Sequence, residues 1–525
     1  MPLPKAHLTS SRTPALRAGA AGKLADLLQR HRWVPLAAAF AIIEIAYAFF
    51  VSAGSFTHWP TTLSFLDDQA EGFRAGHLHF AIEPAAALLA KGNPFDPAWK
   101  PLWYWDASLY NGHYYLYWGP VPALLLAGFK TLCRVQGRVG DQYVVFALAS
   151  LQALAGLLLI DRAHRRLFPA VPGILVALAV AVFAFVNPTL YNLSRAAVYE
   201  AAIVGGHAFL VTGLLFAFHA VTAVGGPRHR LRLCLYLALA GVSWALALGC
   251  RASIAPGVLL LVAATCWLGV PGDRGSWPGR ARALAWLGTP VAVGVACLLA
   301  YNKLRFDAWF DFGRHYQLTW IPFSGSAAFV PANAWSYLLR PFTMRCTFPY
   351  LHAVTDMGVR ALPAWLRPPH GYIVYEPVIG CLLAIPWAWL APVSAVAGIR
   401  RAWALARGRG DSDAAAVAVT WLAVATSLAA VASFIVPLTL FWATMRFLGD
   451  MTPALALAGT LGWWLCWARF RERAARRRLL VSAAVVLALA TVGVGVALGF
   501  AGQYRHFREH NPALLDRLEN RLSFC

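Results

Sequence analysis

Apolar runs long enough to cross a bilayer recur along the whole chain, and short, mostly basic segments separate them. Runs of about 20 apolar residues are the sequence pattern of transmembrane helices. The runs suited to spanning are 34–54, 142–160, 172–190, 198–221, 233–250, 254–270, 283–301, 377–399, 414–440, 452–468 and 479–501. The pattern predicts an all-α polytopic membrane protein with about 11 transmembrane helices.

One further apolar run, residues 118–133, is short for a span. As a helix its 16 residues would rise about 24 Å, against a hydrocarbon core of about 30 Å, and they include Lys130. The arginine-rich segments between later spans share one side of the membrane with the basic N-terminus only if this run does not cross. We therefore expect an interfacial helix in the outer leaflet, within a long first external loop.

This topology divides the chain into parts and places its charges. The expected parts are a cytoplasmic N-terminus (1–33), a transmembrane core (34–301) that includes the external loop 55–141, a second external loop (302–376), and C-terminal transmembrane helices with an external tail (377–525). Most acidic residues then fall on the external side, whereas the cytoplasmic loops are short and basic. We expect any chemistry to take place on the external face.

Composition agrees with a membrane protein and narrows its partners. Hydrophobic residues make up 59% of the chain and charged residues 13%, about half the charge of a typical soluble protein. The 45 basic residues cluster between apolar runs, so we attribute the net charge of +22 to positive-inside loops and expect no nucleic-acid partner. The nine cysteines lie mostly in apolar runs and show no CxxC spacing. We expect them to be small buried side chains rather than disulfides or zinc ligands.

An acidic stretch, LSFLDDQAEGF at 63–73, follows the first apolar run. The neighbouring carboxylates of Asp67 and Asp68 should repel each other and raise the pKa of one, which suits a general base or a cation site. Glu71 would share a helix face with Asp67. The alternative is a solvated first turn of a helix, where acidic residues are favoured by the helix dipole.

An aromatic stretch, YWDASLYNGHYYLYWGPVP at 104–122, contains polar residues around an Asn-Gly turn. Flat apolar rings mixed with short polar side chains suit a pocket for a carbohydrate or an isoprenoid. The candidate substrate-binding residues here are Trp105, Asp106, Tyr110, Asn111, His113 and Tyr115, together with Glu71 and Glu200. An interfacial aromatic belt is the alternative explanation for some of these rings.

Arginines at the outer ends of spans are candidates for binding a lipid phosphate. The guanidinium group offers a planar fork of donors that fits phosphate oxygens. The candidates are Arg195, Arg305 and Arg446, and we expect Asp450 to orient Arg446. Ordinary anchoring at the membrane interface is the alternative for each arginine. The chain has no G-x-G-x-x-G, G-x-x-x-x-G-K-[ST], H-E-x-x-H or nucleophile-elbow motif, so a membrane lipid is the expected donor.

Several of these motifs together resemble the GT-C superfamily of polytopic membrane glycosyltransferases, in the bacterial branch related to protein mannosyltransferases and aminoarabinose transferases. The motifs are DDQAEGFRAGHLHF, NPFDP, YWDASLYNGHYYLYWGPVPALL, YE and RFLGDMTP. The mannosyltransferases' DE pair and HPPLGK segment are missing, so the donor sugar and the acceptor stay open.

The resemblance implies a reaction on the outer face of a bacterial inner membrane. A polyprenyl-phosphate sugar would donate its glycosyl group, usually with inversion, to a glycan, lipid or protein acceptor. Asp67 or Asp68 would be the base, so either Asp→Asn variant should fold but not transfer. Some members of the superfamily need a divalent cation, Mg²⁺ or Mn²⁺, and the sequence leaves this need open here. The alternatives are a transporter or flippase of a lipid-linked sugar and a non-catalytic assembly protein.

Overall fold

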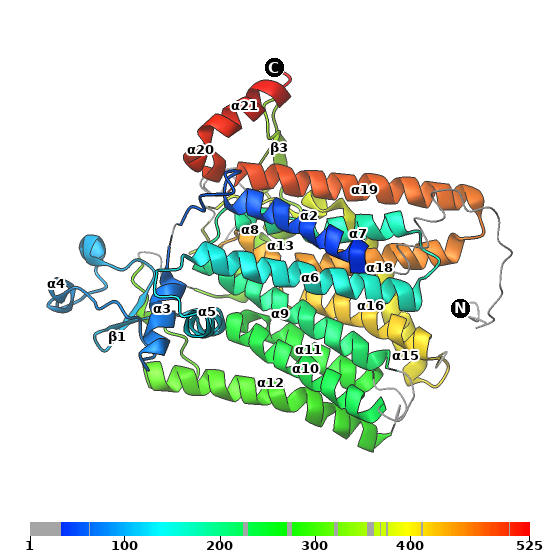
Figure 1. Ribbon diagram of the computed structural model, residues 1–525, viewed down its shortest axis with the longest axis horizontal. Coiled ribbons are helices and arrows are strands. Elements are labelled where there is room, and N and C mark those ends of the chain that lie inside the picture. The colour runs from blue at the N-terminus through cyan, green and yellow to red at the C-terminus, as the bar shows by residue number, and fades with distance from the viewer. Residues whose placement is uncertain are drawn as a thin grey trace.

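The computed structural model describes residues 33–61, 63–223, 229–269, 276–319, 324–353, 362–367, 369–373, 376–410, 413–502 and 505–525. Its core is a bundle of long helices that lie side by side (Figure 1). The bundle helices are α2 (Trp33–Val51), α6 (Asp141–Leu167), α7 (Gly173–Phe185), α9 (Val198–Val221), α10 (His229–Cys250), α11 (Ala255–Leu268), α12 (Trp277–Phe306), α15 (Ala391–Ala406), α16 (Ala414–Ala432), α18 (Thr452–Phe470) and α19 (Ala474–Ala501).

Seven helical segments of the described residues are long and apolar enough to cross a membrane. These are α2, α6, α9, α10, α12, α19 and the segment Ala414–Leu438, which joins α16 to α17 (Ile435–Leu438). The all-α, multi-pass membrane fold expected from the sequence is therefore confirmed, whereas the count of 11 crossings stays a prediction. Residues 1–32 of the expected cytoplasmic N-terminus lie outside the described residues.

Close contacts between the helices depend on small residues. A Cβ atom added at Gly241 of α10 would lie 2.3 Å from the carbonyl oxygen of Leu287 in α12, and one at Gly495 of α19 would lie 2.0 Å from that of Phe185 in α7. Helices in a membrane gain stability from close backbone approach rather than from a hydrophobic driving force between them. Side chains at these two positions would push the helices apart.

The connections at one end of the bundle are long and structured (Figure 1). They contain α3 (Phe65–Arg74), α4 (Ala86–Leu89), η1 (Pro97–Leu102), β1 (Ser108–Tyr110), β2 (His113–Tyr115), α5 (Val121–Leu132), α8 (Thr189–Leu193), η2 (Ala252–Ile254), η3 (Arg314–Tyr316), η4 (Ala327–Phe329), α13 (Val330–Leu338), β3 (Phe342–Met344), β4 (Leu351–Ala353) and η7 (Met445–Asp450). Two short elements, α14 (Cys381–Ala384) and η6 (Pro386–Leu390), lie instead along the bundle, where Trp387 bonds to Thr460 of α18 and Thr491 of α19.

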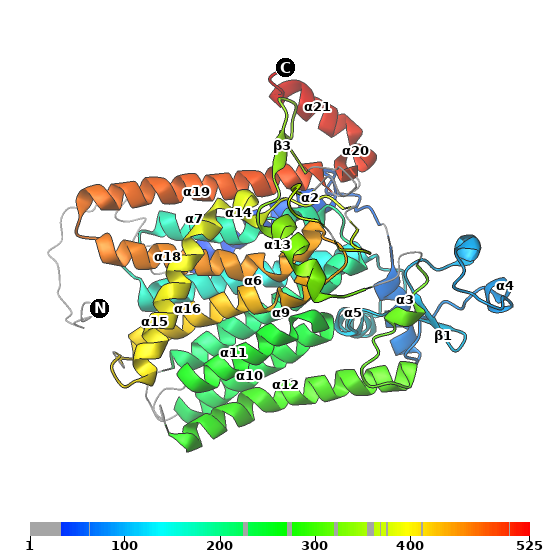
Figure 2. The ribbon, with the colours of Figure 1, turned by 180° about the vertical axis from the view of Figure 1, so that it is seen from behind.

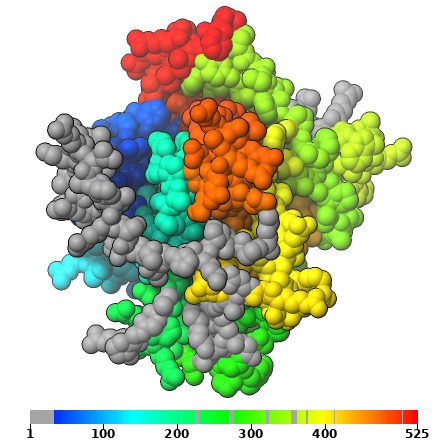
Figure 3. All heavy atoms as spheres, turned by 90° about the vertical axis from the view of Figure 1, so that its right-hand side faces the viewer, coloured from blue at the N-terminus to red at the C-terminus, as the bar shows by residue number. Residues whose placement is uncertain are grey.

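The helix α5 lies across this end of the bundle, and the two opposite views in Figures 1 and 2 both look along it. It packs beside α3. This arrangement agrees with the expectation that residues 118–133 do not cross with the other helices. At the other end, seen in Figure 3, the connection between α18 and α19 is short, and the basic residues 471–478 are exposed.

A two-stranded hairpin lies within the aromatic stretch. Strands β1 and β2 are antiparallel, with Ser108 opposite Tyr115 and Tyr110 opposite His113. Asn111 and Gly112, at the turn, have φ angles of 48° and 79°. Both are in the left-handed region, which these two residue types reach at least cost, so the turn predicted from Asn-Gly is confirmed.

The C-terminal helices are attached by a disulfide bond to the hairpin of β3 and β4, within the predicted second external loop. Helices α20 (His506–His510) and α21 (Pro512–Leu522) lie beside the hairpin in which β3 pairs with β4, at the top of Figure 1. Cys346 and Cys525 form the disulfide, with Cα atoms 5.8 Å apart. The expectation that the cysteines form no disulfide is therefore wrong for this pair. These two cysteines lie outside the predicted spans, and the sequence interpretation overlooked this difference from most of the others.

We expect Cys346 and Cys525 to resist thiol alkylation in the native protein until a reductant is added. Disulfides persist in oxidising compartments, so a protected pair would place both the second loop and the C-terminus on the outer side. Alkylation before and after reduction, followed by mass spectrometry of the peptides, measures this. Cys133, an exposed free cysteine, is the control that should react in both samples. Complete alkylation of Cys525 without reductant would contradict the expected topology.

Candidate functional site

A cavity of about 410 Å³ lies at the structured end of the bundle. Its lining combines four arginines with two carboxylates and several aromatic rings. The polar and aromatic residues that concern the chemistry are Trp105, Asp106, Tyr117, Trp118, Arg195, Tyr199, Arg251, Arg314, Gln317, Glu376, Phe441, Trp442, Arg446 and Phe447. We call this cavity the arginine pocket.

Asp106 is held on one wall of the arginine pocket by paired backbone segments. Its N–H donates to the carbonyl oxygen of Leu318 at 3.0 Å, and the N–H of Leu318 donates to Ala107 at 2.8 Å. The φ angle of Asp106 is 66°, a left-handed conformation that a non-glycine residue adopts only when its surroundings impose it. The backbone therefore fixes the direction of this carboxylate.

The Asp106 carboxylate accepts hydrogen bonds from the hydroxyl group of Tyr199 and from Nε2 of Gln317, the latter at 3.0 Å. Burial raises the pKa of Asp106, while these two hydrogen bonds and the charges of Arg446 and Arg195 oppose the rise. A carboxylate with a raised pKa is a better proton acceptor than an ordinary surface aspartate. Asp106 is therefore a lining carboxylate with a raised pKa, which makes it the candidate general base of this pocket.

The arginines of the pocket are positioned by carboxylates. Arg446 pairs with Glu376 at 3.0 Å, and Arg195 pairs with Glu200 at 3.3 Å. Glu200 lies 3.9 Å from Arg446 as well, and it is fully buried. Four guanidinium groups and two carboxylates line the pocket, and the buried acids Glu200 and Asp450 lie behind the arginines and balance their charge. A fork-shaped, preorganised donor set of this kind fits the oxygens of a phosphate.

Asp450 forms its ion pair with Arg251 at 2.5 Å, not with Arg446 as the sequence suggested. Burial raises the pKa of Asp450 to about 6, and the bond to Arg251 opposes the rise. Arg446 is oriented by Glu376 instead, which comes from a distant part of the chain. Sequence spacing could not show this exchange of partners, because η7 is not a regular α-helix and does not place residues 446 and 450 on one face.

Arg305, the remaining predicted phosphate ligand, lies outside the lining of the pocket. Its guanidinium group donates to the carbonyl oxygen of Leu116 and to Oδ1 of Asn302, and it lies 3.8 Å from the ring centre of Tyr301. It is 3% exposed. These contacts attach the end of α12 to the aromatic stretch, so Arg305 supports the wall and does not face the cavity.

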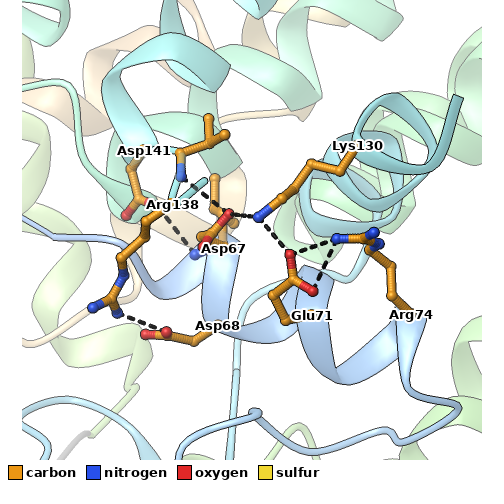
Figure 4. Close-up of polar contacts among 9 residues, drawn as sticks. Asp67, Asp68, Glu71, Arg74, Lys130, Arg138 and Asp141 are labelled. Atoms are coloured by element: carbon orange, nitrogen blue, oxygen red, sulfur yellow. Dashed lines mark hydrogen bonds and ion pairs between the residues drawn. The ribbon is translucent and has the colours of Figure 1, made fainter. Parts of the chain in front are cut away.

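Asp67, Asp68 and Glu71 form a separate cluster beside the pocket, which Figure 4 shows. Lys130 of α5 reaches between Asp67, at 2.6 Å, and Glu71, at 2.5 Å. Arg138 pairs with Asp68 at 2.6 Å, and the hydroxyl group of Tyr104 donates to the same carboxylate at 2.5 Å. We call these residues the α3 cluster. None of its acids is among the residues that line the arginine pocket.

In the α3 cluster, Asp67 and Asp68 are buried and each is paired with a basic side chain. Burial raises the pKa of Asp68; Tyr104 and Arg138 oppose the rise, and repulsion from Asp67 adds only a smaller contribution. Both aspartates are 4% exposed. The pair is thus neither a solvated helix turn nor a pair of mutually repelling free acids. Its ion pairs join α3 to α5 and to the segment before α6.

Replacing Asp67 with asparagine should destabilise the protein. If Asp67 and Asp68 only repelled each other, the same change would cause no loss of stability. The change removes one carboxylate from Lys130, whose side chain is 1% exposed. We expect the free energy of unfolding to fall by about 1–3 kcal/mol, the scale for a buried group that loses a partner. The melting temperature in detergent micelles measures this. Asp67→Asn/Lys130→Met, which removes both charges, should recover much of the loss. An unchanged melting temperature for Asp67→Asn would contradict this role.

The hairpin residues predicted to bind substrate divide into two groups. Trp105 and Asp106 line the arginine pocket, but Tyr110, Asn111, His113 and Tyr115 are not among its lining residues. The Tyr110 hydroxyl donates to Asp307 at 3.2 Å, and Tyr115 packs its ring 5.3 Å from that of Phe306. Tyr110 and Tyr115 therefore connect the hairpin to the end of α12.

Sequence reasoning missed several residues of the pocket. Arg251 occupies the short turn between the predicted spans 233–250 and 254–270, where a lone charge was a usable signal. Arg314 lies nine residues after the candidate Arg305, and Tyr117 and Trp118 lie in the aromatic stretch. Tyr199 belongs to the YE motif at 199–200, but only the fold brings it to Asp106, and only the fold brings Glu376 to Arg446.

The pocket does not offer the ligand set expected for Mg²⁺ or Mn²⁺. These ions prefer several oxygen ligands around one point. Among the described residues, one group of three potential metal ligands lies close together, and it consists of His79, Glu83 and His113 outside the pocket. Asp106 is engaged by Tyr199 and Gln317, and Glu376 is engaged by Arg446. No step of the chemistry below uses a divalent cation.

Comparisons with models of protein families and with curated proteins find no match. Solved structures of an oligosaccharyltransferase from Archaeoglobus fulgidus do match. One holds a tethered acceptor peptide with an NVT sequon (TM-score 0.42, 14% identity), a second is the AglB protein with an inhibitory peptide and a dolichol-phosphate (0.46, 13%), and a third is the apo form (0.40, 14%).

Each match covers 89% of this chain and 55–56% of the matched chain, so this chain spans about half the length of the structures it matches. At TM-scores of 0.40–0.46 and identities of 13–14% this likeness carries no argument about function, which has to come from the geometry of the site.

Proposed function

We propose that this protein is a GT-C-type glycosyltransferase that moves a sugar from a polyprenyl-phosphate donor to an acceptor hydroxyl or amine at the outer face of a bacterial inner membrane. One observation carries the proposal: a single pocket at one end of the bundle combines a fixed carboxylate, four arginines and aromatic walls. An enzyme that uses a lipid-linked donor needs no nucleotide-binding fold. It needs a carboxylate to accept a proton, arginines to bind the phosphate and aromatic rings to contact the sugar and the lipid.

The reaction that fits the pocket is a displacement at the anomeric carbon. Asp106 accepts the proton of the acceptor while the acceptor oxygen or nitrogen bonds to that carbon. The bond between the anomeric carbon and the phosphate oxygen breaks, and the polyprenyl phosphate leaves with the bonding electrons. The arginines stabilise the charge that grows on this phosphate. Attack from the side opposite the leaving group inverts the configuration.

We assign the base to Asp106 rather than to Asp67 or Asp68. A general base must reach the acceptor through a hydrogen bond, directly or through one water molecule. Asp106 lines the cavity, whereas the two earlier aspartates bond to Lys130, Tyr104 and Arg138 beside it. Their role in the proposal is to hold α3 and α5 in place next to the pocket.

The aromatic wall suits both parts of the donor. Trp105, Tyr117 and Trp118 line the cavity together with Tyr199, whose ring lies under the guanidinium group of Arg446 at 5.0 Å. Flat rings pack against the apolar faces of sugars and against isoprenoid chains. The acceptor is a glycan, a lipid or a protein, and the chemistry of the pocket fits a hydroxyl group in any of these.

Mass spectrometry of surface glycans tests the proposed function. A strain without the protein should lose one glycan modification, and the wild-type chain supplied from a plasmid should restore it. The undecorated acceptor and the sugar-loaded polyprenyl phosphate should both accumulate in the deletion strain. Unchanged glycans and lipid-linked sugars would overturn the proposal.

A transporter or flippase of a lipid-linked sugar is the second candidate, because it too would bind a polyprenyl phosphate. A flippase carries its cargo through the bundle, and it would need polar groups from both ends. The groups of the arginine pocket come from the end where α9 begins and α10 ends. Accumulation of donor on the cytoplasmic face in the deletion strain would favour the flippase.

A further inference from the structure

Three potential metal ligands meet on the first outer loop, apart from the arginine pocket. His79 and Glu83 belong to the segment that follows α3, and His113 lies in β2. One ligand atom from each residue lies within 4.8 Å of those from the other two. None of the three lines the pocket. The same segment also brings His77 to stack on His79, with ring centres 4.7 Å apart.

The two histidines present ring nitrogens suited to coordination. Nδ1 of His79 lies 2.8 Å from the carbonyl oxygen of Phe80, which can only accept, so Nδ1 carries the proton and Nε2 keeps its lone pair. A backbone acceptor of this kind is the usual support of a metal-binding histidine. Nδ1 of His113 is buried without a hydrogen-bond partner, although Oε2 of Glu83 lies 3.4 Å away.

The backbone holds these ligands close together, whereas the two imidazole rings have to turn before both can coordinate one ion. The N–H of Phe80 donates to the carbonyl oxygen of Tyr114 at 2.8 Å, which pairs the segment after α3 with β2. The rings of His79 and His113 stack with centres 4.1 Å apart. In this stack the lone pairs, which lie in the ring planes, run nearly parallel, so a change of rotamer in one side chain is needed to bring both nitrogens to one ion.

We propose that His79, Glu83 and His113 bind one transition-metal dication of the Zn²⁺ type through two imidazole nitrogens and one carboxylate oxygen. Two nitrogens and one oxygen suit Zn²⁺, and neighbouring ions such as Ni²⁺ or Co²⁺, but not Mg²⁺, which prefers oxygen alone. Three protein ligands leave a tetrahedral ion one further position for water or another side chain.

A metal at this site would fix the outer loop and support the pocket indirectly. It would connect the segment after α3 to β2, and β1 of the same hairpin begins two residues after Asp106. The three ligands are positioning residues in this account and do not touch the proposed substrate. The inference rests on their geometry alone and stands whether or not the protein transfers sugars.

Zinc retention by the purified full chain tests the proposal. The protein should carry an affinity tag without histidine, be stripped with a chelator, reloaded with Zn²⁺ and analysed for metal per chain. We expect one tightly held Zn²⁺ per wild-type chain, a higher melting temperature with Zn²⁺, and no such rise with Mg²⁺. The control His58→Ala/His370→Ala, which removes two exposed histidines elsewhere, should behave like wild type.

His79→Ala/His113→Ala should lose the bound zinc and the rise in melting temperature. Glu83→Gln is a second, milder variant, because this side chain is 63% exposed and its loss cannot disrupt a core. It should weaken zinc binding at least about 10-fold, the lower end of the range for changes around metal sites. Zinc retention by His79→Ala/His113→Ala equal to that of wild type, or a wild-type chain that holds less than one ion, would overturn the proposal.

Discussion

Asp106→Asn should lower the rate of glycosyl transfer by about 10²–10⁴-fold, the range for the loss of a general base, while the protein still folds. Asparagine keeps an oxygen that can accept from Tyr199 or Gln317, and it tolerates the left-handed backbone at this position, where φ is 66°. Only the capacity to accept a proton is lost. Transfer by purified protein from a polyprenyl-phosphate sugar, together with its melting temperature, measures both effects.

Asp307→Asn is the matched control for this variant. Asp307 also has a left-handed backbone, with a φ of 56°, and it also bonds to a tyrosine, Tyr110. It does not line the arginine pocket. The control should keep the wild-type rate. A fully active Asp106→Asn variant would return the role of base to another carboxylate, with Asp68 the next to test.

The pH dependence of transfer should reflect the raised pKa of Asp106, which burial causes. The base must be ionised to accept a proton, so activity is present above this pKa and falls as the pH drops through it. We expect the acid limb of the rate profile to lie above the usual aspartate pKa of about 3.9. The limb should disappear from the residual activity of Asp106→Asn.

Arg446→Lys should weaken the binding of polyprenyl phosphate by about 1.5–3 kcal/mol, the scale for one hydrogen bond to a charged group. This corresponds to a loss in affinity of roughly 10–150-fold. Lysine keeps the positive charge beside Glu376 but loses the planar fork, which is the feature that fits two phosphate oxygens. A titration of the lipid phosphate into nanodisc-embedded protein measures the dissociation constant.

Arg138→Lys is the control for the effect of the lost fork. Arg138 also pairs with a carboxylate, that of Asp68, but its side chain is 57% exposed and lies outside the pocket. Its replacement should leave the affinity within about 2-fold of wild type, as for an exposed pair. If Arg446→Lys binds the lipid phosphate as tightly as wild type does, Arg446 only anchors its turn.

The sequence predicted the helical membrane fold because apolar runs and basic loops record the bilayer directly. It also separated α5 from the bundle helices, since the run 118–133 is short and the later charges required it not to cross. The Asn111-Gly112 turn followed from local backbone preference alone. These features depend on residues that are close together in the sequence, so they can be predicted from the sequence alone.

The candidate site was predicted only in part, because its partners come from distant segments. Asp106, Arg195 and Arg446 were marked from local pattern, and all three line the pocket. The pairing of Arg446 with Glu376 joins residues 70 positions apart, and no spacing rule reaches that far. Asp67 and Asp68 drew attention as an adjacent pair, but Lys130 and Arg138, more than 60 positions later, decide what their carboxylates do.

A structure of the full chain with bound polyprenyl phosphate, solved by electron microscopy in nanodiscs, tests the central claim most directly. The claim is that the arginine pocket holds the donor phosphate next to Asp106. We predict phosphate density within hydrogen-bond distance of Arg446 and at least one of Arg195, Arg251 and Arg314, with the lipid chain leaving along the aromatic wall. Phosphate density at Lys130 and Arg138 of the α3 cluster, with the arginine pocket empty, would contradict the account.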